Sequence, residues 1–578
     1  MSTEVNFMVG GEAGQGLQSV GFILAKSFVR GGYHVFADQD YESRIRGGHS
    51  FFRVRASDNP VSAITEPLDF LLALNRETID LHRKELVPKG VIIFDRAKIP
   101  DLKGEGLFGI PLEELAETAG NKVMANTVAL GAVLGLVDYD RDILNMMLRE
   151  SFPGKDSSVG EANVKAAAAG YDYARQNFKG ILPKGKDHLK PISDVKRMLL
   201  NGTDAVALGA IAAGCKFLAA YPMTPTTPII EYMASKAREY GLVVVQPEDE
   251  ISAINMVVGA AYTGVRAMTA TSGSGFCLMV EGLCLAGITE TPAVIVLGQR
   301  PGPAVGLPTR TSQEELEFAI HVGSGEFPRA VLAPGTIEEH FWLTVKVFNL
   351  AEKYQIPVIL LTDHHLATSY ATVPPFDLSK VTIDRGILFT DKTGAKPEEY
   401  KRHQLTPSGI SPRAFPGQSP ALVVTDSDEH DEAGHLIEDA VTRSAQVEKR
   451  MRKMSGLKQE IAPPLRYGPE SAEITLIGWG GTRGAIQEAV DMLRKEGGSV
   501  NSIHLAELWP FPAEEMAKAL ANTRQSYVIE NNATGQLSHL IRAETGYKVT
   551  GRILKYDGRP FTPAYIAGKV RKREVATW

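Results

Sequence analysis

EVNFMVGGEAGQGLQSVGFILAKSFVRGGYHVFAD, residues 4–38, is the stretch that predicts the fold class. A short apolar run leads into a glycine-rich turn. A segment with apolar residues at helical spacing follows, and then a glycine pair and a second apolar run. Strand, turn, helix and strand in this order predict an α/β domain built on a parallel sheet. DFLLAL and GVIIFD continue the alternation, so we expect an α/β protein with several domains.

Composition narrows the class of protein. The chain has 578 residues, 44% apolar and 22% charged, with a formal net charge of −6. About three or four domains are expected for this length, and the charge gives no reason to expect a nucleic-acid partner. No apolar run approaches the roughly 20 residues of a membrane span. The first residues also lack the basic and apolar regions of a signal peptide.

The cysteine content indicates a reducing compartment and argues against an iron–sulfur cluster held by this chain alone. The sequence holds only Cys215, Cys277 and Cys284, with no C-x-x-C motif. This composition suits a reducing cytoplasm, where we expect the protein to act. Four-cysteine ligation of an iron–sulfur cluster cannot be built from this chain alone.

Four segments are predicted along the chain. A first α/β domain covers 1–183 and ends in a basic, glycine- and proline-bearing linker, and a second covers 195–425. Residues 426–465 are predicted to be a charged loop followed by an exposed helix, and a last α/β domain covers 466–578. The charged run DSDEHDEAGH at 426–435 could bind a divalent metal ion. A solvated acidic loop that caps the following helix is the favoured interpretation.

YPMTPTTP, residues 221–228, places prolines and threonines directly before a predicted helix. Thr227 suits the N-cap position, and Pro228 suits the first helical position. A helix N-terminus carries partial positive charge and unpaired N–H groups, so the hydroxyls of Thr224 and Thr226 would complete a small carboxylate site. A helix start that is merely capped needs only one threonine, and both interpretations stay open on spacing alone.

Three acids, Glu248, Asp249 and Glu250, precede the next predicted helix. Acids at a helix start are common because they interact favourably with the helix dipole. A carboxyl group buried at the end of a strand could instead hold a proton against a heterocyclic nitrogen. Downstream, TATSGSGF at 269–276 resembles a tight turn that lets a ligand approach the backbone.

Two pairs of arginines lie on glycine-bearing loops. Arg300 and Arg310 belong to QRPGPAVGLPTRT, and a guanidinium suits bidentate binding of a carboxylate. Arg44 and Arg46 belong to SRIRGGHS, downstream of the GGEAGQG turn, which lacks both the dinucleotide-binding pattern and the P-loop lysine. This second pair suits a phosphate or a pantetheine-type ligand. Exposed surface arginines and an interface loop of salt bridges are the alternatives.

Together these motifs resemble the 2-oxoacid:ferredoxin oxidoreductases, and among them the large subunits in which a γ domain is fused ahead of the α part. YPMTPTTP resembles the family's Tyr-Pro-Ile-Thr-Pro-Ser motif, and GQRPGPAVGLPTRT and SDEHDEAGH resemble the two-subunit bacterial forms. GGEAGQG and SRIRGGHS resemble the γ domain. The resemblance implies a γ-type α/β domain, a thiamine-diphosphate pyrimidine-binding α/β domain and a transketolase C-terminal-like α/β domain with a structural role.

The resemblance also implies cofactors and partners. Thiamine diphosphate would be shared with a smaller β subunit, because no Gly-Asp-Gly motif for the magnesium-diphosphate occurs in this chain. That subunit would carry the Mg2+ and a 4Fe-4S cluster, and no metal site is expected here. Ferredoxin is the implied electron acceptor, CoA the implied co-substrate, and an (αβ)2 heterotetramer the implied assembly.

Residue roles follow from the same resemblance. Glu250 matches the family's catalytic glutamate at the aminopyrimidine ring, and Thr224 matches the threonine that holds the substrate's 1-carboxylate and keto group. Arg310, in GLPTR, matches a substrate-carboxylate arginine. The other expected contacts are Tyr221, Pro222 and Thr226 for substrate; Thr271, Ser272 and Gly273 for cofactor; and Arg44, Arg46, Gly14 and Gln15 for CoA.

The implied reaction converts 2-oxoglutarate, CoA and oxidised ferredoxin to succinyl-CoA, CO2 and reduced ferredoxin. The fused layout and the GLPTR motif resemble the 2-oxoglutarate enzymes most, and an arginine suits a second carboxylate. The alternatives are the same chemistry on pyruvate or on branched-chain or aryl 2-oxoacids, and a non-catalytic scaffold or regulatory paralogue.

Overall fold

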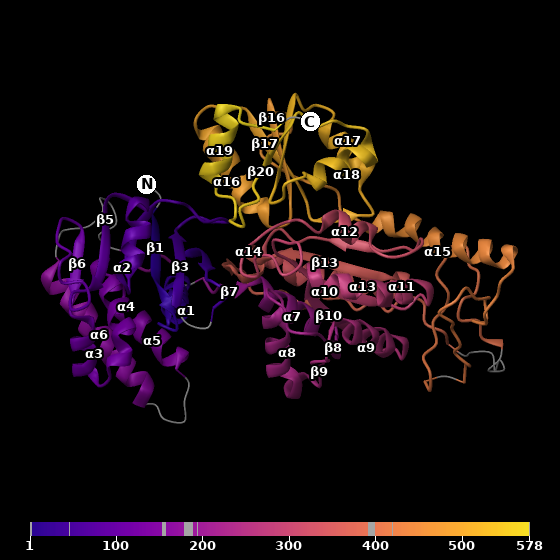
Figure 1. Cartoon of the computed structure of the whole chain (residues 1–578), viewed down its shortest axis with the longest axis horizontal. Helices are drawn as coiled ribbons and strands as arrows, with labels where there is room; N and C mark the ends of the chain where they lie inside the picture. The colour runs from indigo at the N-terminus through magenta and orange to yellow at the C-terminus, as the bar shows by residue number, and fades with distance from the viewer. Residues whose placement is uncertain are drawn as a thin grey trace. The chain divides into compact units, whose positions relative to one another are not determined.

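The computed structural model forms two compact units (Figure 1). Unit 1 comprises Met1–Asn201, Thr368–Phe376 and Thr562–Ala564, and unit 2 comprises Gly202–Ala367, Asp377–Phe561 and Tyr565–Trp578. The residues described are 3–44, 47–152, 158–178, 189–193, 195–390, 399–418 and 420–576. The predicted domain boundary at 183 lies outside them, and those at 195, 426 and 466 stay predictions. None of the helices described is long and apolar enough to cross a membrane.

Unit 1 is built on an eight-stranded sheet in the order β6-β5-β4-β1-β3-β2-β14-β7. Strand β3 lies antiparallel between β1 and β2, whereas β4, β5 and β6 run parallel to β1. The predicted parallel sheet is therefore wrong for this unit, because Gly47 and Gly48 of SRIRGGHS open strand β3. The bounds are β1 Glu4–Ala13, β2 His34–Asp40, β3 Gly47–Ser57, β4 Leu68–Ala73, β5 Leu86–Asp95, β6 Leu107–Ile110, β7 Met198–Asn201 and β14 Tyr370–Val373.

Six α-helices accompany this sheet in the described part of unit 1. A core cluster joins apolar residues of the sheet to helices α1, α4, α5 and α6. Helices α4 and α6 approach closely because Gly131 and Gly170 lack side chains, and a Cβ at either would clash with the backbone of the other helix. The bounds are α1 Leu17–Arg30, α2 Arg76–His82, α3 Leu112–Ala119, α4 Ala125–Leu136, α5 Arg141–Ser151 and α6 Ser158–Asn177.

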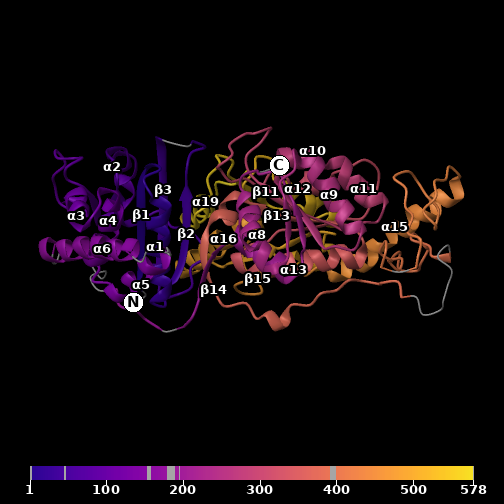
Figure 2. The same ribbon diagram turned by 90° about the horizontal axis from the view of Figure 1, so that it is seen from below.

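Unit 2 contains a seven-stranded sheet in the order β18-β12-β13-β11-β10-β8-β9. All of its neighbouring strands run parallel except β18, which pairs antiparallel with β12. In Figure 2, α9, α10 and α12 lie to one side of β11 and β13, and their apolar residues share one core cluster with those strands. The strand bounds are β8 Phe217–Ala219, β9 Val243–Val245, β10 Ala267–Ser272, β11 Ala293–Gln299, β12 Ala330–Leu332, β13 Pro357–Asp363 and β18 Glu507–Trp509.

The helices of this part of unit 2 follow the strands in the order that the β/α alternation predicts. Their bounds are α7 Gly202–Ala212, α8 Thr227–Tyr240, α9 Glu250–Tyr262, α10 Gly273–Leu278, α11 Val280–Ile288, α12 Leu316–His321, α13 Ile337–Tyr354 and α14 His364–Thr368. The strand predicted to end at Tyr221 already ends at Ala219, and Tyr221 is exposed.

A five-stranded sheet, in the order β15-β17-β16-β19-β20, completes unit 2. The predicted strand VNSIHLAELWP is split, because β17 stays in this sheet while β18 joins the seven-stranded one. The strand bounds are β15 Leu465–Tyr467, β16 Ile474–Trp479, β17 Val500–Leu505, β19 Gln525–Glu530 and β20 Gly551–Leu554. The helix bounds are α16 Arg483–Lys495, α17 Ala513–Leu520, α18 Gln536–Thr545 and α19 Pro563–Lys572.

Helix α15, Ala440–Glu460, corrects a prediction, because it is not exposed on all sides. Lys449, Arg450 and Lys453 are at most 2% exposed. Lys453 Nζ lies 2.5 Å from Glu290 Oε2, and Lys449 pairs with Glu290 Oε1. A run of charged residues usually predicts a helix exposed to solvent. Here Glu290, far away in the sequence, supplies the opposite charge, so the lysines can be buried.

Candidate active site

The candidate site lies where strands of the seven-stranded sheet end. Strands β10, β11 and β13 run parallel, and their last residues are Ser272, Gln299 and Asp363. Ligands of open α/β sheets bind outside the carboxyl ends of such strands. The Gly273–Leu278 helix, Arg300 and His364 directly follow these ends, so the sheet gathers residues that lie far apart in the sequence.

The threonine–proline elbow packs onto the end of β11. A Cβ at Gly298 would lie 2.8 Å from both Pro225 Cγ and Thr226 Cγ2, so this close approach needs glycine. Thr226 is fully buried, and its hydroxyl donates to the Met223 carbonyl at 2.9 Å. Thr226, not Thr227 as predicted, is the N-cap of α8, and its side chain makes no cap hydrogen bond. The Thr226 hydroxyl therefore stabilises the elbow itself and does not cap the helix.

Arg300 fixes the backbone of this elbow. Its Nη1 donates to the Thr224 carbonyl oxygen at 2.9 Å, and the arginine is only 7% exposed. Thr224 itself is partly exposed, and no hydrogen bond of its hydroxyl is found within the described residues. Pro222 is also partly exposed. The elbow therefore presents the Thr224 hydroxyl on a backbone that an internal arginine holds.

The three acids before α9 have three different surroundings. Glu248 is exposed, and Asp249 is the N-cap, its Oδ1 accepting from Ser252 N at 2.8 Å. Glu250 is 3% exposed, and its buried Oε1 has no hydrogen-bond partner in the part of the chain described. A buried carboxyl oxygen without a partner is unusual in native proteins, so this oxygen is available to a ligand.

Glu250 faces the glycine turn at the start of α10. A Cβ at Gly275 would clash with Glu250 Oε1 and with Thr271 Oγ1, so both side chains occupy the space that this glycine leaves. Ser272 Oγ is also buried without a described partner. The unpaired polar atoms and the bare backbone fit a flat heterocycle that carries hydrogen-bonding nitrogens. Thiamine's aminopyrimidine is such a ring.

Arg310 contacts its own loop and the turn at Gly558. It is partly buried, its Nη1 donates to the Thr309 carbonyl at 3.0 Å, and its stem packs near Gly558. Burial, together with the nearby His365, Arg310 and Arg300, lowers the pKa of His364 to about 3. His364 is therefore neutral at pH 7, and the positive charge of this region belongs to the arginines.

Gln313 and Glu315 are site neighbours that the motifs did not indicate. Gln313 Nε2 donates to the Trp479 carbonyl at 2.9 Å, and its Oε1 accepts from Asn531 N at 3.0 Å. Asn531, in the segment YVIENNATGQL, thus anchors the loop that carries Arg300 and Arg310. Glu315 is buried beside Gly273. An acid or amide next to a short helix is too common a pattern to stand out in the sequence.

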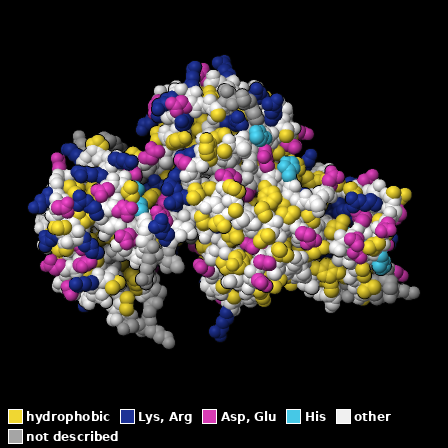
Figure 3. Space-filling model, in the orientation of Figure 1, with side chains coloured by type: hydrophobic (Ala, Val, Ile, Leu, Met, Phe, Trp, Pro, Cys, Tyr) yellow, Lys and Arg dark blue, Asp and Glu magenta, His cyan; other side chains and the backbone are white. Residues whose placement is uncertain are grey.

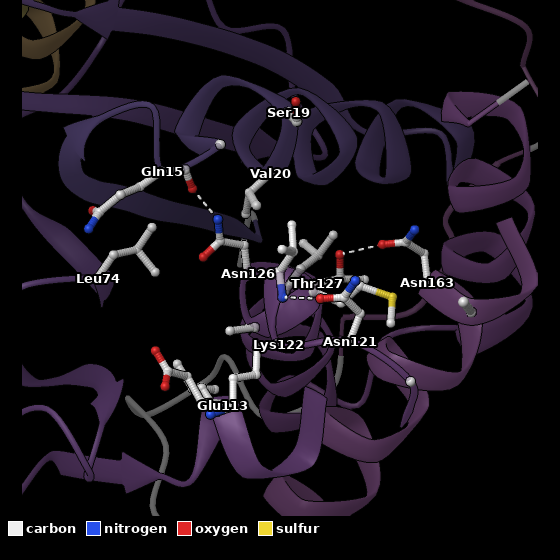
Figure 4. Close-up of a pocket in the computed structure, with 18 of the residues that line it drawn as sticks. Gln15, Ser19, Val20, Leu74, Glu113, Asn121, Lys122, Asn126, Thr127 and Asn163 are labelled. Carbon is white, nitrogen blue, oxygen red and sulfur yellow. Dashed lines mark hydrogen bonds between the residues drawn. The ribbon is translucent and has the colours of Figure 1, made fainter. Parts of the chain in front are cut away.

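Two predicted CoA residues line a cavity of about 690 Å³ in unit 1. Gly14 and Gln15 lie at its rim, and the Asn126 side chain donates to the Gln15 carbonyl. Figure 4 shows Gln15 and Asn126 facing Glu113 and Lys122 across the opening. The cavity offers both backbone and charged groups to a long ligand.

Arg44, one of the two arginines expected at the CoA site, does not line this cavity. Arg44 lines a separate cavity of about 390 Å³, which shares Gly14 and Gly16 with the larger one. Its Nε pairs with Glu42 Oε2 at 2.9 Å. Arg46 lies outside the described residues.

The DSDEHDEAGH segment is a network of internal contacts. Glu429 accepts from both terminal nitrogens of Arg450 at 2.8 Å, and Asp431 Oδ1 accepts three backbone N–H groups within its own turn. Glu432 accepts from Leu405 N at 2.9 Å. Across the described ranges, no three potential ligand side chains come together as a metal-binding group.

Comparison with known proteins gives the family. Residues 6–173 match the pyruvate ferredoxin/flavodoxin oxidoreductase family, 208–449 its thiamine-diphosphate-binding family, and 472–566 core domain II of pyruvate:ferredoxin oxidoreductase. The chain is 32% identical to 2-oxoacid:ferredoxin oxidoreductase 2, subunit alpha, of Aeropyrum pernix, over 98% of this chain and 97% of that one. The chain belongs to the 2-oxoacid:ferredoxin oxidoreductase alpha subunits. It is accordingly part of an oxidoreductase.

Two further relatives bear on the substrate. The 2-oxoglutarate oxidoreductase subunit KorA of Mycobacterium tuberculosis is 29% identical over 98% of this chain and 92% of its own length. A structure of 2-oxoglutarate:ferredoxin oxidoreductase from Magnetococcus marinus, with 2-oxoglutarate, coenzyme A and succinyl-CoA bound, has a TM-score of 0.91 and 34% identity. That match covers 98% of this chain and 99% of the other, so the α/β fold is shared throughout.

Proposed function

We propose that this alpha subunit converts 2-oxoglutarate, CoA and oxidised ferredoxin to succinyl-CoA, CO2 and reduced ferredoxin, together with a smaller β subunit. The observation that carries the proposal is the buried, partnerless Oε1 of Glu250 on the Gly275 turn. Thiamine diphosphate, when bound, supplies the electron sink for loss of CO2 from a 2-oxoacid.

The chain's own residues would do three things in this reaction. Glu250 would hold a proton at the ring nitrogen of the aminopyrimidine, because its Oε1 is buried at the turn that the ring would fill. Thr224 would donate its hydroxyl to the 1-carboxylate, on a backbone held by Arg300. Thr271, Ser272 and Gly273 would close the wall behind the ring and exclude water.

Arg310 favours a dicarboxylic substrate. A guanidinium binds a carboxylate by a fork of two N–H groups, and pyruvate offers no second carboxylate. The Magnetococcus enzyme, whose structure holds 2-oxoglutarate and succinyl-CoA, shares the fold along the whole chain. Both observations support 2-oxoglutarate over pyruvate and over branched-chain or aryl 2-oxoacids.

A β subunit would supply what this sequence lacks. The chain has no Gly-Asp-Gly motif and only three cysteines, so we assign the Mg2+ and the 4Fe-4S cluster to the partner, within an (αβ)2 heterotetramer. Ile251, Met256 and Leu278, on the helices beside Glu250, are 41–49% exposed. In Figure 3 hydrophobic side chains gather over the part of unit 2 that holds α7–α10. A partner that covers this face would also close the site.

CoA would occupy the unit 1 cavity. Gly14 and Gln15 present backbone at its rim, and Lys122 adds a positive charge suited to a phosphate. Arg44 lines the smaller cavity, which shares Gly14 with the larger one.

Ferredoxin reduction by the assembled αβ complex tests the substrate. With CoA present, 2-oxoglutarate should give the highest kcat/KM among 2-oxoglutarate, pyruvate and branched-chain or aryl 2-oxoacids. Arg310→Met should lower kcat/KM for 2-oxoglutarate by about tenfold to a hundredfold and leave pyruvate nearly unchanged, because only the dicarboxylate loses a charge-assisted hydrogen bond. Arg238→Met, an exposed arginine of α8, is the matched control. Equal loss for both substrates, or a preference for pyruvate, would contradict the assignment.

A further inference from the structure

Glu315 is a second buried carboxyl group at the same turn. It is 8% exposed, and its Oε2 has no hydrogen-bond partner among the residues described. A Cβ at Gly273 would clash with its Oε1, so the side chain lies against the first residue of α10. Glu250 lies against Gly275, two residues further on. One glycine turn thus accommodates both acids.

The ordinary explanation for an acid in this position does not hold. Glu315 is the N-cap of α12, yet its side chain makes no cap hydrogen bond. Its backbone N–H donates to Gln299 Oε1 at 3.2 Å, which ties it to the end of β11. Neither this bond nor the helix start uses the carboxyl group, which is turned toward the site.

Among the residues described, three charged or titratable groups interact with Glu315. Glu314 precedes it in the chain, Arg300 follows β11, and Cys277 lies on α10. Burial and, to a smaller extent, Glu314 raise the pKa of Glu315 to about 8, although Arg300 opposes the shift. Glu315 is therefore mainly a neutral carboxylic acid at pH 7.

Arg300 interacts with both this acid and the elbow. Its guanidinium donates to the Thr224 carbonyl and makes no ion pair with Glu315 within the described part of the chain. A buried arginine needs hydrogen-bond acceptors for its N–H groups, and a nearby carboxylate accepts a stronger hydrogen bond than a backbone carbonyl does. A neutral Glu315 would therefore leave Arg300 on the Thr224 carbonyl.

We propose that Glu315 is a positioning residue for the substrate clamp, which is the Thr224 hydroxyl on the backbone that Arg300 holds. In its neutral form Glu315 leaves Arg300 on the Thr224 carbonyl, and its ionisation draws Arg300 away. This inference rests on the proposed function, since the clamp is defined by the 2-oxoacid that Thr224 would hold. Loss of the clamp raises KM for the 2-oxoacid, whereas kcat changes little, because Glu250 and the turn are unaffected.

The pH dependence of KM tests the proposal in the αβ complex. KM for 2-oxoglutarate should be constant below about pH 8 and rise about tenfold for each pH unit above it, as the competent fraction falls. Glu315→Gln, which stays neutral, should abolish the rise and keep the low KM. Glu315→Asp should retain it. Glu281→Gln, an exposed acid of α11, is the control and should behave as wild type. Ionisation of CoA is common to all variants and cancels in the comparison.

A second readout does not depend on turnover. In infrared spectra of the full chain, a protonated carboxylic acid band should disappear as pH rises through about 8. The band should be absent from Glu315→Gln, a comparison needed because burial also raises the pKa of Glu530. This titration reports on Glu315 even if Glu315→Gln fails to assemble, since a wild-type chain without such a band overturns the proposal.

The possible outcomes separate the two proposals. A Glu315→Gln profile identical to wild type, or a wild-type KM independent of pH, refutes the role of Glu315. A complex that reduces ferredoxin with no 2-oxoacid refutes the proposed function instead, and leaves the infrared titration to decide the charge of Glu315.

Discussion

Glu250 and Glu290 are both buried in unit 2, and their surroundings are opposite. Glu290 is fully buried and paired with Lys449 and Lys453, and its Oε1 lies 3.0 Å from His403 Nδ1. Burial alone would raise its pKa, but the two lysines hold that pKa well below 4.5. Glu250 is buried to a similar degree, and its Oε1 contacts no described partner.

This contrast distinguishes buried acids that stabilise the fold from buried acids that belong to the candidate active site. A buried charge costs several kcal/mol unless it is paired, so a scaffold acid collects partners as Glu290 does. An acid that keeps an open oxygen costs stability in the isolated chain, and such a residue persists where a ligand or partner satisfies it. Glu250 and Glu315, both at the glycine turn, are of this second kind.

The largest expected effect is on turnover. Glu250→Gln should reduce ferredoxin reduction by the αβ complex about a thousandfold or more, because proton transfer by a positioned carboxyl contributes about 10²–10⁴. The thermal midpoint of unfolding should not fall, since no described contact of Oε1 is lost. Steady-state assays and calorimetry measure the two quantities.

Glu248→Gln is the matched control, since Glu248 is exposed two residues earlier. It should leave both rate and midpoint unchanged. A Glu250→Gln enzyme with the wild-type rate would remove this residue from the mechanism.

The next effect should fall on stability alone. Glu290→Gln leaves Lys449 and Lys453 buried without their counter-charge, which should cost about 3–5 kcal/mol of unfolding free energy. The kcat of the complex that remains folded should be unchanged. Chemical denaturation followed by circular dichroism measures the loss.

Glu326→Gln, an exposed acid, is the control for this change and should alter stability by less than about 0.5 kcal/mol. A catalytic defect in folded Glu290→Gln would erase the distinction between scaffold and site acids.

The last effect is a change in how stability depends on pH. The pKa of Glu315 in the folded chain, about 8, is above its ordinary value of 4.5. The folded state therefore holds a proton that the unfolded chain has lost between these values, and stability falls as pH rises through this window. The slope is about 1.4 kcal/mol per pH unit for one proton. Glu315→Gln should remove that contribution, measured as the difference between the variant and wild type from about pH 5 to pH 8. Equal slopes would show that Glu315 is already ionised.

Much of the fold could be predicted from the sequence, because β/α alternation and glycine turns are local signals. Strand direction is not local. Strand β3, Gly47–Ser57, turns the sheet of unit 1 into a mixed one, and β18, Glu507–Trp509, leaves its neighbours for another sheet. Helix α15 was predicted to be exposed because Glu290, which pairs with its lysines, lies more than a hundred residues away.

The site was predictable only in part. The elbow was recognised from three threonines where one cap suffices, but spacing chose Thr227 where the structure uses Thr226. Glu250 was selected among three acids by its resemblance to a family motif, and its role stays a prediction. Glu315 was missed, since only burial distinguishes it from the acids that commonly precede helices.

A binding cycle tests the role of Glu250 most directly. Thiamine diphosphate and an analogue that lacks the pyrimidine ring nitrogen facing Glu250 are each titrated into the wild-type and Glu250→Ala αβ complexes with Mg2+, and calorimetry gives the Kd. The wild type should bind thiamine diphosphate about tenfold or more tighter than the analogue, because a hydrogen bond to a charged group is worth about 1.5–3 kcal/mol. Glu250→Ala should bind both equally. A wild-type complex that does not distinguish the two would contradict the placement of the ring at Glu250.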